Sequence, residues 1–403
     1  MTLTLPTYAL THCRLYTGEG QLADHAVRIA GDRIVDILPE AALPGDCPTV
    51  DLQGQVIAPG FIDLQLNGCG GVMFNDAITA ATLDQMHRTN LRSGTTSFLP
   101  TLITAPDADM QAAIALVQQY RQQQPHSVLG LHLEGPYLNP QRKGIHNGAD
   151  VRSLDPAMVQ TLVEAGGETI KLLTLAPEQV TNTDIQQLVS AGIQVSAGHT
   201  NATLEEALVG FEAGISMATH LFNAMSPWQS RNPGMVGAVF QQESVYAGII
   251  ADGHHVHFTS IQLAKKLKGD KLFLVTDATP PAGTDPDGTD QMMSFQIGGH
   301  EVFYQGGKCV SAEGTLGGSA LTMIGAIAHI VLDVGIELAE ALRMASLYPA
   351  RAIGVDHQLG RLAPGYMANL VLLDDRLSVL GVVDQGQLRS FAPDFLSQPS
   401  SPS

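Results

Sequence analysis

The chain has 403 residues, of which 44% are hydrophobic, so it can bury a large core and is long for one simple domain. Lysine and arginine total 21 against 39 acidic residues, and the resulting net charge of −18 argues against nucleic acid or an anionic membrane as a partner. Four cysteines without paired spacing predict free thiols in a reducing cytoplasm: Cys13, Cys47, Cys69 and Cys309.

The N-terminal region has the sequence pattern of β-structure. Residues 1–10 contain no basic run followed by an apolar core, so we expect no secretory signal, and no run of about 20 apolar residues predicts a membrane span. Residues 26–38 predict a hairpin around the turn Gly31-Asp32. Residues 50–57 predict a further short strand.

Strand and helix patterns alternate through residues 59–358, the predicted central domain. Eight apolar runs have the composition of strands, and they lie at residues 56–66, 95–102, 128–133, 170–175, 193–197, 215–219, 246–251 and 272–276. Thr203 and Glu206 form a capping box before one of the intervening helical patterns, and Gly214 ends it. Eight βα units predict an α/β fold, a closed (β/α)₈ TIM-type barrel. An open doubly wound sheet is the alternative, but no Gly-rich phosphate loop follows the first strand.

Another strand is predicted near the C-terminus, at residues 368–373. We expect it to pair with the N-terminal strands, so that residues 1–58 and 359–390 form one small β-sandwich domain. Residues 391–403 are rich in proline, serine and glutamine and predict a loose tail.

Ionisable residues stand where five of the barrel strands are expected to end. The sequence changes there from apolar to polar at Glu134, His199, His220, Asp252 and Asp277. In a barrel of this type the active site is built at the carboxyl ends of the strands, so these side chains should lie close together.

Glu134, His199 and His220 together suit zinc or a similar divalent ion, because one carboxylate and two imidazoles leave a coordination position open for water. Such an ion lowers the pKa of its water toward about 7, and Asp277 can take the proton and later give it to a leaving group. Each residue alone more often has a structural role, as a cap partner, an ion pair or a core histidine. His132 shares the strand face of Glu134 and is expected to fill the interior or support the ligands rather than bind metal.

Several sequence blocks carry a family resemblance. Residues 59–63 (PGFID) and 360–371 (GRLAPGYMANLV) resemble the amidohydrolase superfamily. Further blocks resemble its N-acetylglucosamine-6-phosphate deacetylase family: residues 67–71 (NGCGG), 132–136 (HLEGP), 196–199 (SAGH), 219–225 (THLFNAM), 251–253 (ADG) and 275–278 (VTDA). The resemblance runs from about residue 8 to residue 373, nearly the whole chain.

The resemblance implies specific roles. It makes Glu134, His199 and His220 the metal ligands, Asp277 the general base and acid, and His146 the residue that polarises the acetyl carbonyl. It also implies substrate contacts by Ile145, His146, Asn223, Ala224, Arg231, His255, Leu316, Gly317 and Gly318. His254 and His257 are expected to be ordinary polar residues.

The resemblance also implies a role for Arg231 in binding the substrate phosphate. The family is dimeric and shares its phosphate-binding arginine across the subunit interface, and Arg231 lies at that position in a loop with two prolines and Trp228. Arginine suits phosphate geometry, and an exposed tryptophan suits an interface. The alternatives are a solvated loop charge, or a monomer whose Arg231 folds back over its own site.

The sequence departs from the wider superfamily after the first barrel strand. Many members carry His-x-His there for a second metal, whereas this chain has Gln65-Leu66-Asn67. Neutral amides replace imidazole poorly on a transition metal, so we expect one ion per subunit, zinc before Fe²⁺ or another divalent ion.

The expected reaction is hydrolysis of the acetamide of N-acetylglucosamine 6-phosphate, in amino-sugar catabolism. Three alternatives stand beside it: the N-acetylgalactosamine epimer as substrate, a cyclic amide as substrate, and a barrel that only binds sugar phosphates. Cyclic amide hydrolases usually carry His-x-His and often a modified lysine on strand four. Here strand four has Lys171 at its start and ends in Leu175-Ala176-Pro177-Glu178, which argues against that substrate. A barrel without activity would usually have lost ligands or the proton carrier, and here all are present.

Overall fold

The computed structural model describes residues 2–3, 6–284 and 293–392. The chain forms two compact units. The first comprises residues 1–62, 90–97 and 323–403, and the second comprises residues 63–89 and 98–322. Among the described residues, no helix combines the length and the hydropathy needed to cross a membrane.

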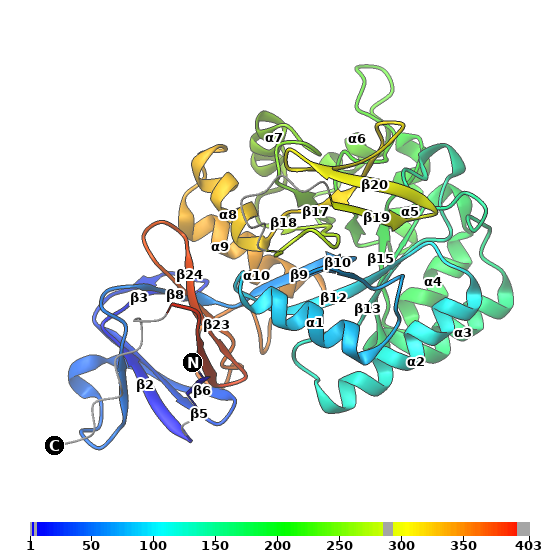
Figure 1. Cartoon of the computed structure of the whole chain (residues 1–403). Helices are drawn as coiled ribbons and strands as arrows, with labels where there is room; N and C mark the ends of the chain where they lie inside the picture. Colours follow the sequence, from blue (N-terminus) through cyan, green and yellow to red (C-terminus); the bar gives the residue numbers. More distant parts are fainter. Residues whose placement is uncertain (1, 4–5, 285–292, 393–403) are drawn as a thin grey trace. The chain divides into compact units, whose positions relative to one another are not determined.

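The central sheet has eight strands, and each is hydrogen-bonded to the next one along the chain, as the sequence predicts (Figure 1). These strands are β9 (Phe61–Leu66), β12 (Thr95–Ile103), β13 (Leu131–Glu134), β14 (Ile170–Leu175), β15 (Gln194–Ala197), β16 (Met217–Ala218), β17 (Tyr246–Ile250) and β18 (Leu272–Val275). Leu66 and Ala278 form a parallel bridge, and Asp277 N donates to Gln65 O at 2.9 Å. These contacts join the last strand to the first, so the sheet closes as a barrel and the prediction of an α/β barrel is confirmed.

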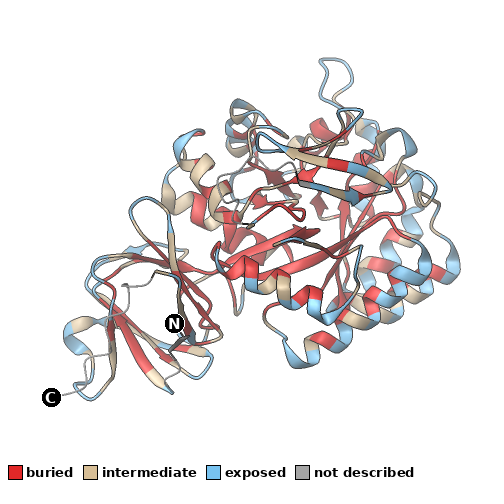
Figure 2. Cartoon of the chain, viewed as in Figure 1, coloured by how far each residue is buried: buried red, intermediate tan, exposed pale blue. Residues whose placement is uncertain are grey.

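The described helices are α1 (Ala80–Leu91), α2 (Asp107–Gln123), α3 (Pro156–Thr169), α4 (Asn182–Ser190), α5 (Leu204–Ala213), α6 (Gly234–Gln241), α7 (Phe258–Lys268), α8 (Met323–Leu332), α9 (Leu338–Ala345) and α10 (Leu347–Ala352). Helices such as α2, α4 and α5 show buried residues on one face and exposed residues on the other, whereas α6 and α10 are buried over most of their length (Figure 2). Helix α5 has the predicted capping box, with Glu206 N donating to Thr203 Oγ1 at 3.2 Å and Thr203 N to Glu206 Oε2 at 2.8 Å. Its C-cap is Gly214, as expected.

The two ends of the chain build one pair of sheets in the first unit, as predicted. One sheet has the order β1-β25-β24-β23-β8-β3-β4 and the other β6-β5-β2-β7. The N-terminal strands are β1 (Thr2–Leu3), β2 (Thr7–Thr11), β3 (Arg14–Tyr16), β4 (Gln21–Leu22), β5 (His25–Ala30), β6 (Arg33–Pro39), β7 (Thr49–Asp51) and β8 (Val56–Pro59). The C-terminal strands are β23 (Leu370–Leu373), β24 (Val379–Asp384) and β25 (Gln387–Ser390). Side chains from both ends of the chain share one buried core there.

Two predicted strands are wrong in their limits. Residues 56–66 form two strands rather than one, because Pro59-Gly60 separates β8 from β9. A Cβ atom on Gly60 would lie 2.2 Å from Thr96 Oγ1, so only glycine allows this close approach. Residues 50–57 likewise divide between β7 and β8. The tail predicted at residues 391–403 lies, beyond residue 392, outside the described residues.

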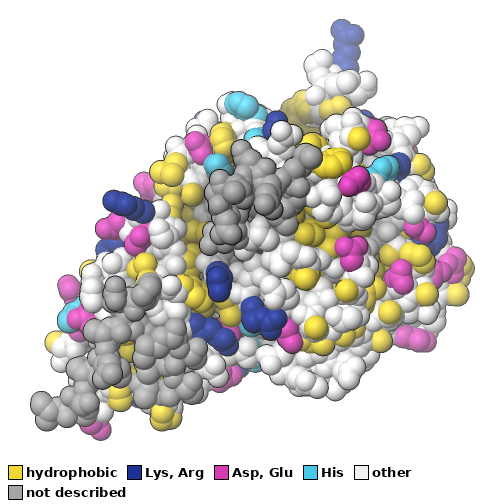
Figure 3. Space-filling model, in the orientation of Figure 1, with side chains coloured by type: hydrophobic (Ala, Val, Ile, Leu, Met, Phe, Trp, Pro, Cys, Tyr) yellow, Lys and Arg dark blue, Asp and Glu magenta, His cyan; other side chains and the backbone are white. Residues whose placement is uncertain are grey.

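The second unit also holds two small antiparallel sheets that the sequence did not suggest. One is the pair β10 (Gly68–Cys69) and β11 (Val72–Met73). The other has four strands, β19 (Met293–Ile297), β20 (His300–Gln305), β21 (Lys308–Ser311) and β22 (Leu316–Ser319). On the face drawn in Figure 3, acidic side chains are scattered, and lysine and arginine side chains lie in a few groups.

Candidate metal centre and active site

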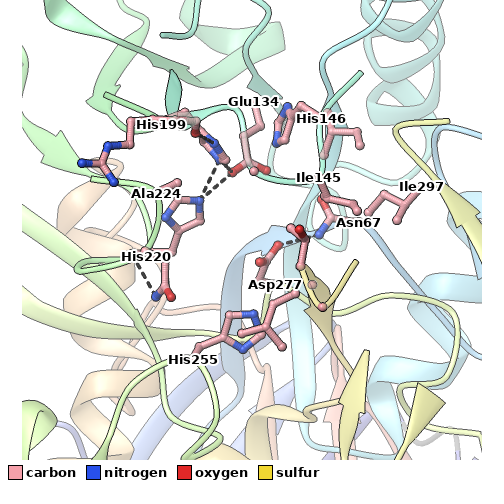
Figure 4. Close-up of a pocket in the computed structure, with 18 of the residues that line it drawn as sticks. Asn67, Glu134, Ile145, His146, His199, His220, Ala224, His255, Asp277 and Ile297 are labelled. Carbon is pink, nitrogen blue, oxygen red and sulfur yellow. Dashed lines mark hydrogen bonds and ion pairs between the residues drawn. The ribbon is translucent and has the colours of Figure 1, made fainter. Parts of the chain in front are cut away.

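The strand ends bring the predicted catalytic side chains into one cavity. Glu134 is the last residue of β13, and His199, His220 and Asp277 each follow a barrel strand by two residues. All four line a cavity of about 410 Å³, inside the range of about 300–1,000 Å³ typical of small-molecule sites. Figure 4 shows the carboxylates and imidazoles pointing into this common space.

Three side-chain atoms converge in the cavity as ligands of one ion would. Oε1 of Glu134 lies 3.2 Å from Nε2 of His199 and 3.1 Å from Nε2 of His220, and the two Nε2 atoms are 3.0 Å apart. Tetrahedral ligands at about 2.0–2.1 Å from zinc would be about 3.3–3.4 Å apart, so small shifts would admit an ion. Nδ1 of His199 lies 2.9 Å from the carbonyl oxygen of Arg142. A carbonyl oxygen can only accept a hydrogen bond, so this contact places the ring proton of His199 on Nδ1. Nε2 of His199 then offers a lone pair to the site.

The charges at this cluster also suit a cation. Burial by itself would raise the pKa of Glu134, but hydrogen bonds and charges from His199 and His220 hold it well below its usual range. Burial disfavours the charged form of His220, yet the hydrogen bond and charge of Glu134 outweigh that and raise its pKa. The two imidazoles therefore favour the charged form of the buried Glu134 carboxylate, and that carboxylate favours a proton on His220. A divalent ion would balance the carboxylate in place of that proton, so the residues fit a metal.

His146 lies beside the cluster and is held apart from it. Its ligand atom falls within 4.8 Å of those of Glu134 and His199, so this trio is a second possible metal set. However, Nδ1 of His146 is 2.8 Å from Thr104 Oγ1, and its ring packs on that of His199 with centroids 4.4 Å apart. Burial holds the pKa of His146 well below 6.5, so it is neutral. The tighter spacing of Glu134, His199 and His220 makes them the better ligand set, which leaves His146 free to contact substrate.

Asp277 is fixed by the two amides that occupy the place of His-x-His. Asn67 Nδ2 donates to Asp277 Oδ1 at 2.6 Å, and Gln65 Nε2 donates to the same oxygen at 3.3 Å (the Asn67 contact is visible in Figure 4). Gln65 Nε2 also donates to Glu134 Oε1 at 2.9 Å. The amides therefore orient Asp277, the predicted proton carrier, and Glu134, a predicted metal ligand. The sequence analysis noted Gln65 and Asn67 only as poor replacements for metal-binding histidines. It did not predict that their amides donate hydrogen bonds to the two carboxylates.

The environment of Asp277 gives it a pKa suited to proton transfer. Desolvation in the cavity and the charge of Glu134 raise the pKa of Asp277 to about 6, against the lowering influence of His220, His255 and Asn67. A carboxyl group with a pKa near the operating pH can both accept and return a proton.

The backbone is strained where these side chains leave the barrel. His199, His220 and Asp277 have φ values of 48°, 32° and 51°, in the left-handed region that non-glycine residues rarely occupy. Phe222 and Ala224, beside the cavity, share this conformation with φ of 80° and 48°. Each such residue costs on the order of 1–3 kcal/mol and persists only where its surroundings enforce it, most often at functional sites.

His132 lies beneath the cluster, inside the barrel, as expected. Its Nδ1 is 3.2 Å from Thr101 Oγ1, and its Nε2 is 2.8 Å from Thr174 Oγ1. Burial lowers the pKa of His132 to about 4, so the ring is neutral. Both nitrogens have hydroxyl partners, and His132 supports the strand that carries Glu134.

Most of the predicted substrate contacts also line the cavity: Ile145, His146, Asn223, Ala224, His255, Leu316 and Gly318. Gly317 and Arg231 are not among the lining residues. Gly317 is buried behind its neighbours, where a Cβ atom would lie 3.0 Å from Val302. Arg231 is exposed and lines a second pocket, and Arg142 is another of the residues that line this second pocket.

Comparisons with known proteins agree with the fold and show the family. Residues 56–397 match the Amidohydrolase family, and residues 7–57 match the NagA composite domain. An N-acetylglucosamine-6-phosphate deacetylase from Haemophilus influenzae is 45% identical over 94% of this chain and 98% of its own length. An N-acetylgalactosamine-6-phosphate deacetylase from Escherichia coli is 37% identical over 96% of this chain and 100% of its own. The crystal structure of N-acetylglucosamine-6-phosphate deacetylase from Pasteurella multocida superposes with a TM-score of 0.92 at 46% identity, over 95% of this chain and 100% of that one. The chain therefore belongs to the amidohydrolase family, and within it to the branch that contains the N-acetylglucosamine-6-phosphate deacetylases.

Proposed function

We propose that the chain hydrolyses the acetamide of N-acetyl-D-glucosamine 6-phosphate to D-glucosamine 6-phosphate and acetate, in the catabolism of amino sugars. The observation that carries this proposal is the convergence of Glu134, His199 and His220 beside Asp277, in one cavity at the strand ends of the barrel. The 45% identity with a deacetylase of this name supports it. The proposed place of work is the cytoplasm, which the four free cysteines support.

One divalent ion held by Glu134, His199 and His220 is the proposed cofactor, with zinc favoured over Fe²⁺ because two imidazoles and a carboxylate are common catalytic zinc ligands. When bound, such an ion would activate water and polarise the acetyl carbonyl. Asp277 accepts a proton from the attacking water. It then donates that proton to the departing nitrogen, which leaves poorly as an anion.

His146 is proposed to donate a hydrogen bond to the acetyl oxygen. Its ring is neutral, and a proton on Nε2 is available when Nδ1 accepts from Thr104. A donor aimed at this oxygen acts mainly on the transition state, where negative charge develops. The residues proposed to hold the sugar phosphate are Ile145, Asn223, Ala224, Arg231, His255, Leu316 and Gly318, while Gly317 packs behind them.

The N-acetylgalactosamine epimer is the second candidate substrate, because a relative of that name is 37% identical over nearly the whole chain. A side-by-side assay of acetate release from both 6-phosphates and from unphosphorylated N-acetylglucosamine decides between them. We expect the highest kcat/KM with N-acetylglucosamine 6-phosphate. Activity confined to the galactosamine epimer would contradict the proposed substrate, and activity with neither 6-phosphate would contradict the deacetylase function.

We further propose a homodimer in which Arg231 binds the phosphate in the partner's active site. Residues 227–232 are all exposed, and Trp228 anchors this loop to its own chain by packing on Phe240, with ring centroids 5.5 Å apart. Arg231 does not line the cavity of its own chain. An arginine that stands away from its own site can serve a neighbouring copy, and C₂ dimers are the commonest oligomers.

Mixed dimers test this placement of Arg231. Co-expression of Arg231→Ala chains with Asp277→Asn chains should give activity well above either parent at low substrate, because one site per mixed dimer keeps both residues. The matched control joins both changes in one chain and mixes it with wild type. Its mixed dimers should then have no complete site. If Arg231 serves its own chain, the results reverse: the first mixture shows no gain, and the control keeps one complete site.

A further inference from the structure

The orientation of His146 depends on what packs against its loop. His146 stands on an irregular turn, residues 144–147, rather than on a strand or helix. Thr104 Oγ1 contacts Nδ1 of its ring, and the ring of His199 packs against it with a tilt of 54°. Neither contact fixes how far the backbone of the turn reaches into the cavity. Hydrogen bonds between Lys143 and His146 lie within the turn itself, and the small sheet β19–β22 packs against that backbone from another part of the chain.

The hairpin of β19 and β20 approaches the His146 turn through glycine. The two strands pair up to Ile297 and His300, so Gly298 and Gly299 form a two-residue turn, with φ of 56° and 80°. A Cβ atom on Gly298 would lie 2.0 Å from the carbonyl oxygen of Ile145 and 3.1 Å from Asn147 N. The backbone of the hairpin therefore lies directly on the backbone on both sides of His146. A Cβ atom on Gly299 would meet nothing within 4 Å.

Side chains strengthen the same contact. Ile145 and Ile297 belong to one buried cluster with Val302 from the next strand of the sheet, and the first two also line the cavity (Figure 4). The cluster is completed by Met73, Ile103 and Cys309. The side chains of the hairpin and of the His146 turn thus share one buried hydrophobic cluster.

The opposite edge of this sheet is tied to Asp277. Ser319, at the end of β22, donates its N–H to Asp277 O at 2.8 Å and accepts from Thr279 N at 2.9 Å. One small sheet therefore touches the segment of the proton carrier at one edge and the turn of His146 at the other. Such a sheet can set the relative positions of the two groups.

We propose that Gly298 is a positioning residue: its hairpin turn sets the position of His146 relative to Asp277 and thereby supports turnover. The inference rests on the role given to His146 in the proposed function. At residue 298 the turn needs glycine for two reasons: its φ is positive, and a Cβ atom there would collide with the backbone of Ile145. A side chain at residue 298 must push the His146 turn away, and a displacement of about 1 Å at a reacting centre can cost about 10²-fold in rate.

The chain offers a matched pair of variants. Gly298→Ala and Gly299→Ala both place a side chain at positive φ in the same turn, but only the first meets the His146 turn. We expect Gly298→Ala to lower kcat by about tenfold or more with KM changed less than about threefold, and Gly299→Ala to stay within about twofold of wild type. Melting temperatures separate this effect from loss of fold. An equal loss of kcat in both variants would overturn the proposal.

A double-mutant cycle separates the inference from its premise. His146→Ala alone should lower kcat, and Gly298→Ala added to it should cost no more than about twofold further. If His146→Ala leaves kcat unchanged, the role proposed for His146 fails. If His146→Ala lowers kcat and Gly298→Ala lowers it by the same factor with or without His146, the positioning role of Gly298 fails.

A milder variant covers the case in which Gly298→Ala does not fold. Val302→Ala loosens the same buried cluster, and Val302 does not line the cavity. Its loss of kcat should likewise vanish in the His146→Ala background. A loss that persists there would overturn the proposal.

Discussion

Replacing Asp277 by asparagine is expected to lower kcat by about 10²–10⁴-fold, the usual contribution of general acid–base help. Asparagine keeps the size of the side chain, but it can neither accept the proton of the attacking water nor return it to the nitrogen. The amides of Gln65 and Asn67 hold Asp277 through one oxygen, Oδ1, which asparagine can present as its carbonyl oxygen. KM and metal content should therefore stay close to wild type.

The pH profile provides the control for this assignment. Asp277 must be ionised to accept a proton, so kcat/KM should fall as pH drops below its pKa. Burial and Glu134 raise that pKa to about 6 in the ion-free chain, and a bound cation acts in the opposite direction. The acidic limb of the loaded enzyme should therefore lie at or below about pH 6, and it should disappear in Asp277→Asn. Near-normal turnover in the variant, or an unchanged limb, would refute the role of Asp277.

The sequence predicted the barrel well because strand ends are local signals. Glu134, His199, His220 and Asp277 each stand where an apolar run turns polar, and the structure brings all four into one cavity. The pairing of the two chain ends was also predictable, since both ends contained short strands outside the alternating pattern of the barrel. The division between β8 and β9 was missed, although the Pro59-Gly60 dipeptide inside the apolar run is a turn signal.

What the sequence could not predict lies in loops and in long-range contacts. His146 stands on an irregular turn, so only the family resemblance pointed to it. The sheet β19–β22 joins residues far from that turn along the chain, and no local pattern shows that Gly298 meets Ile145. Gln65 and Asn67 were recognised as poor metal ligands. Their use as hydrogen-bond donors became visible only when both carboxylates were placed beside them.

The hydrogen bonds of Gln65 and Asn67 bear directly on the number of metal ions. Nε2 of Gln65 is directed at Glu134 and Asp277, and Nδ2 of Asn67 is directed at Asp277. The two side chains therefore present N–H groups to the carboxylates that a second ion would share. An N–H donor cannot serve as a metal ligand. Any second ion would have to break these contacts, so one tightly held ion per chain is expected.

Removing that ion with a chelator should abolish turnover while the barrel stays folded. The ion-free site remains compensated, because Glu134 keeps its hydrogen-bonded contacts with His199 and His220, one of which can carry the balancing proton. Circular dichroism should thus change little, and titration with Zn²⁺ should restore acetate release in proportion up to one equivalent per chain. Glu134→Gln serves as the control and should show weak binding with no recovery. A requirement for two equivalents, or full activity after metal analysis finds none, would contradict the single catalytic ion.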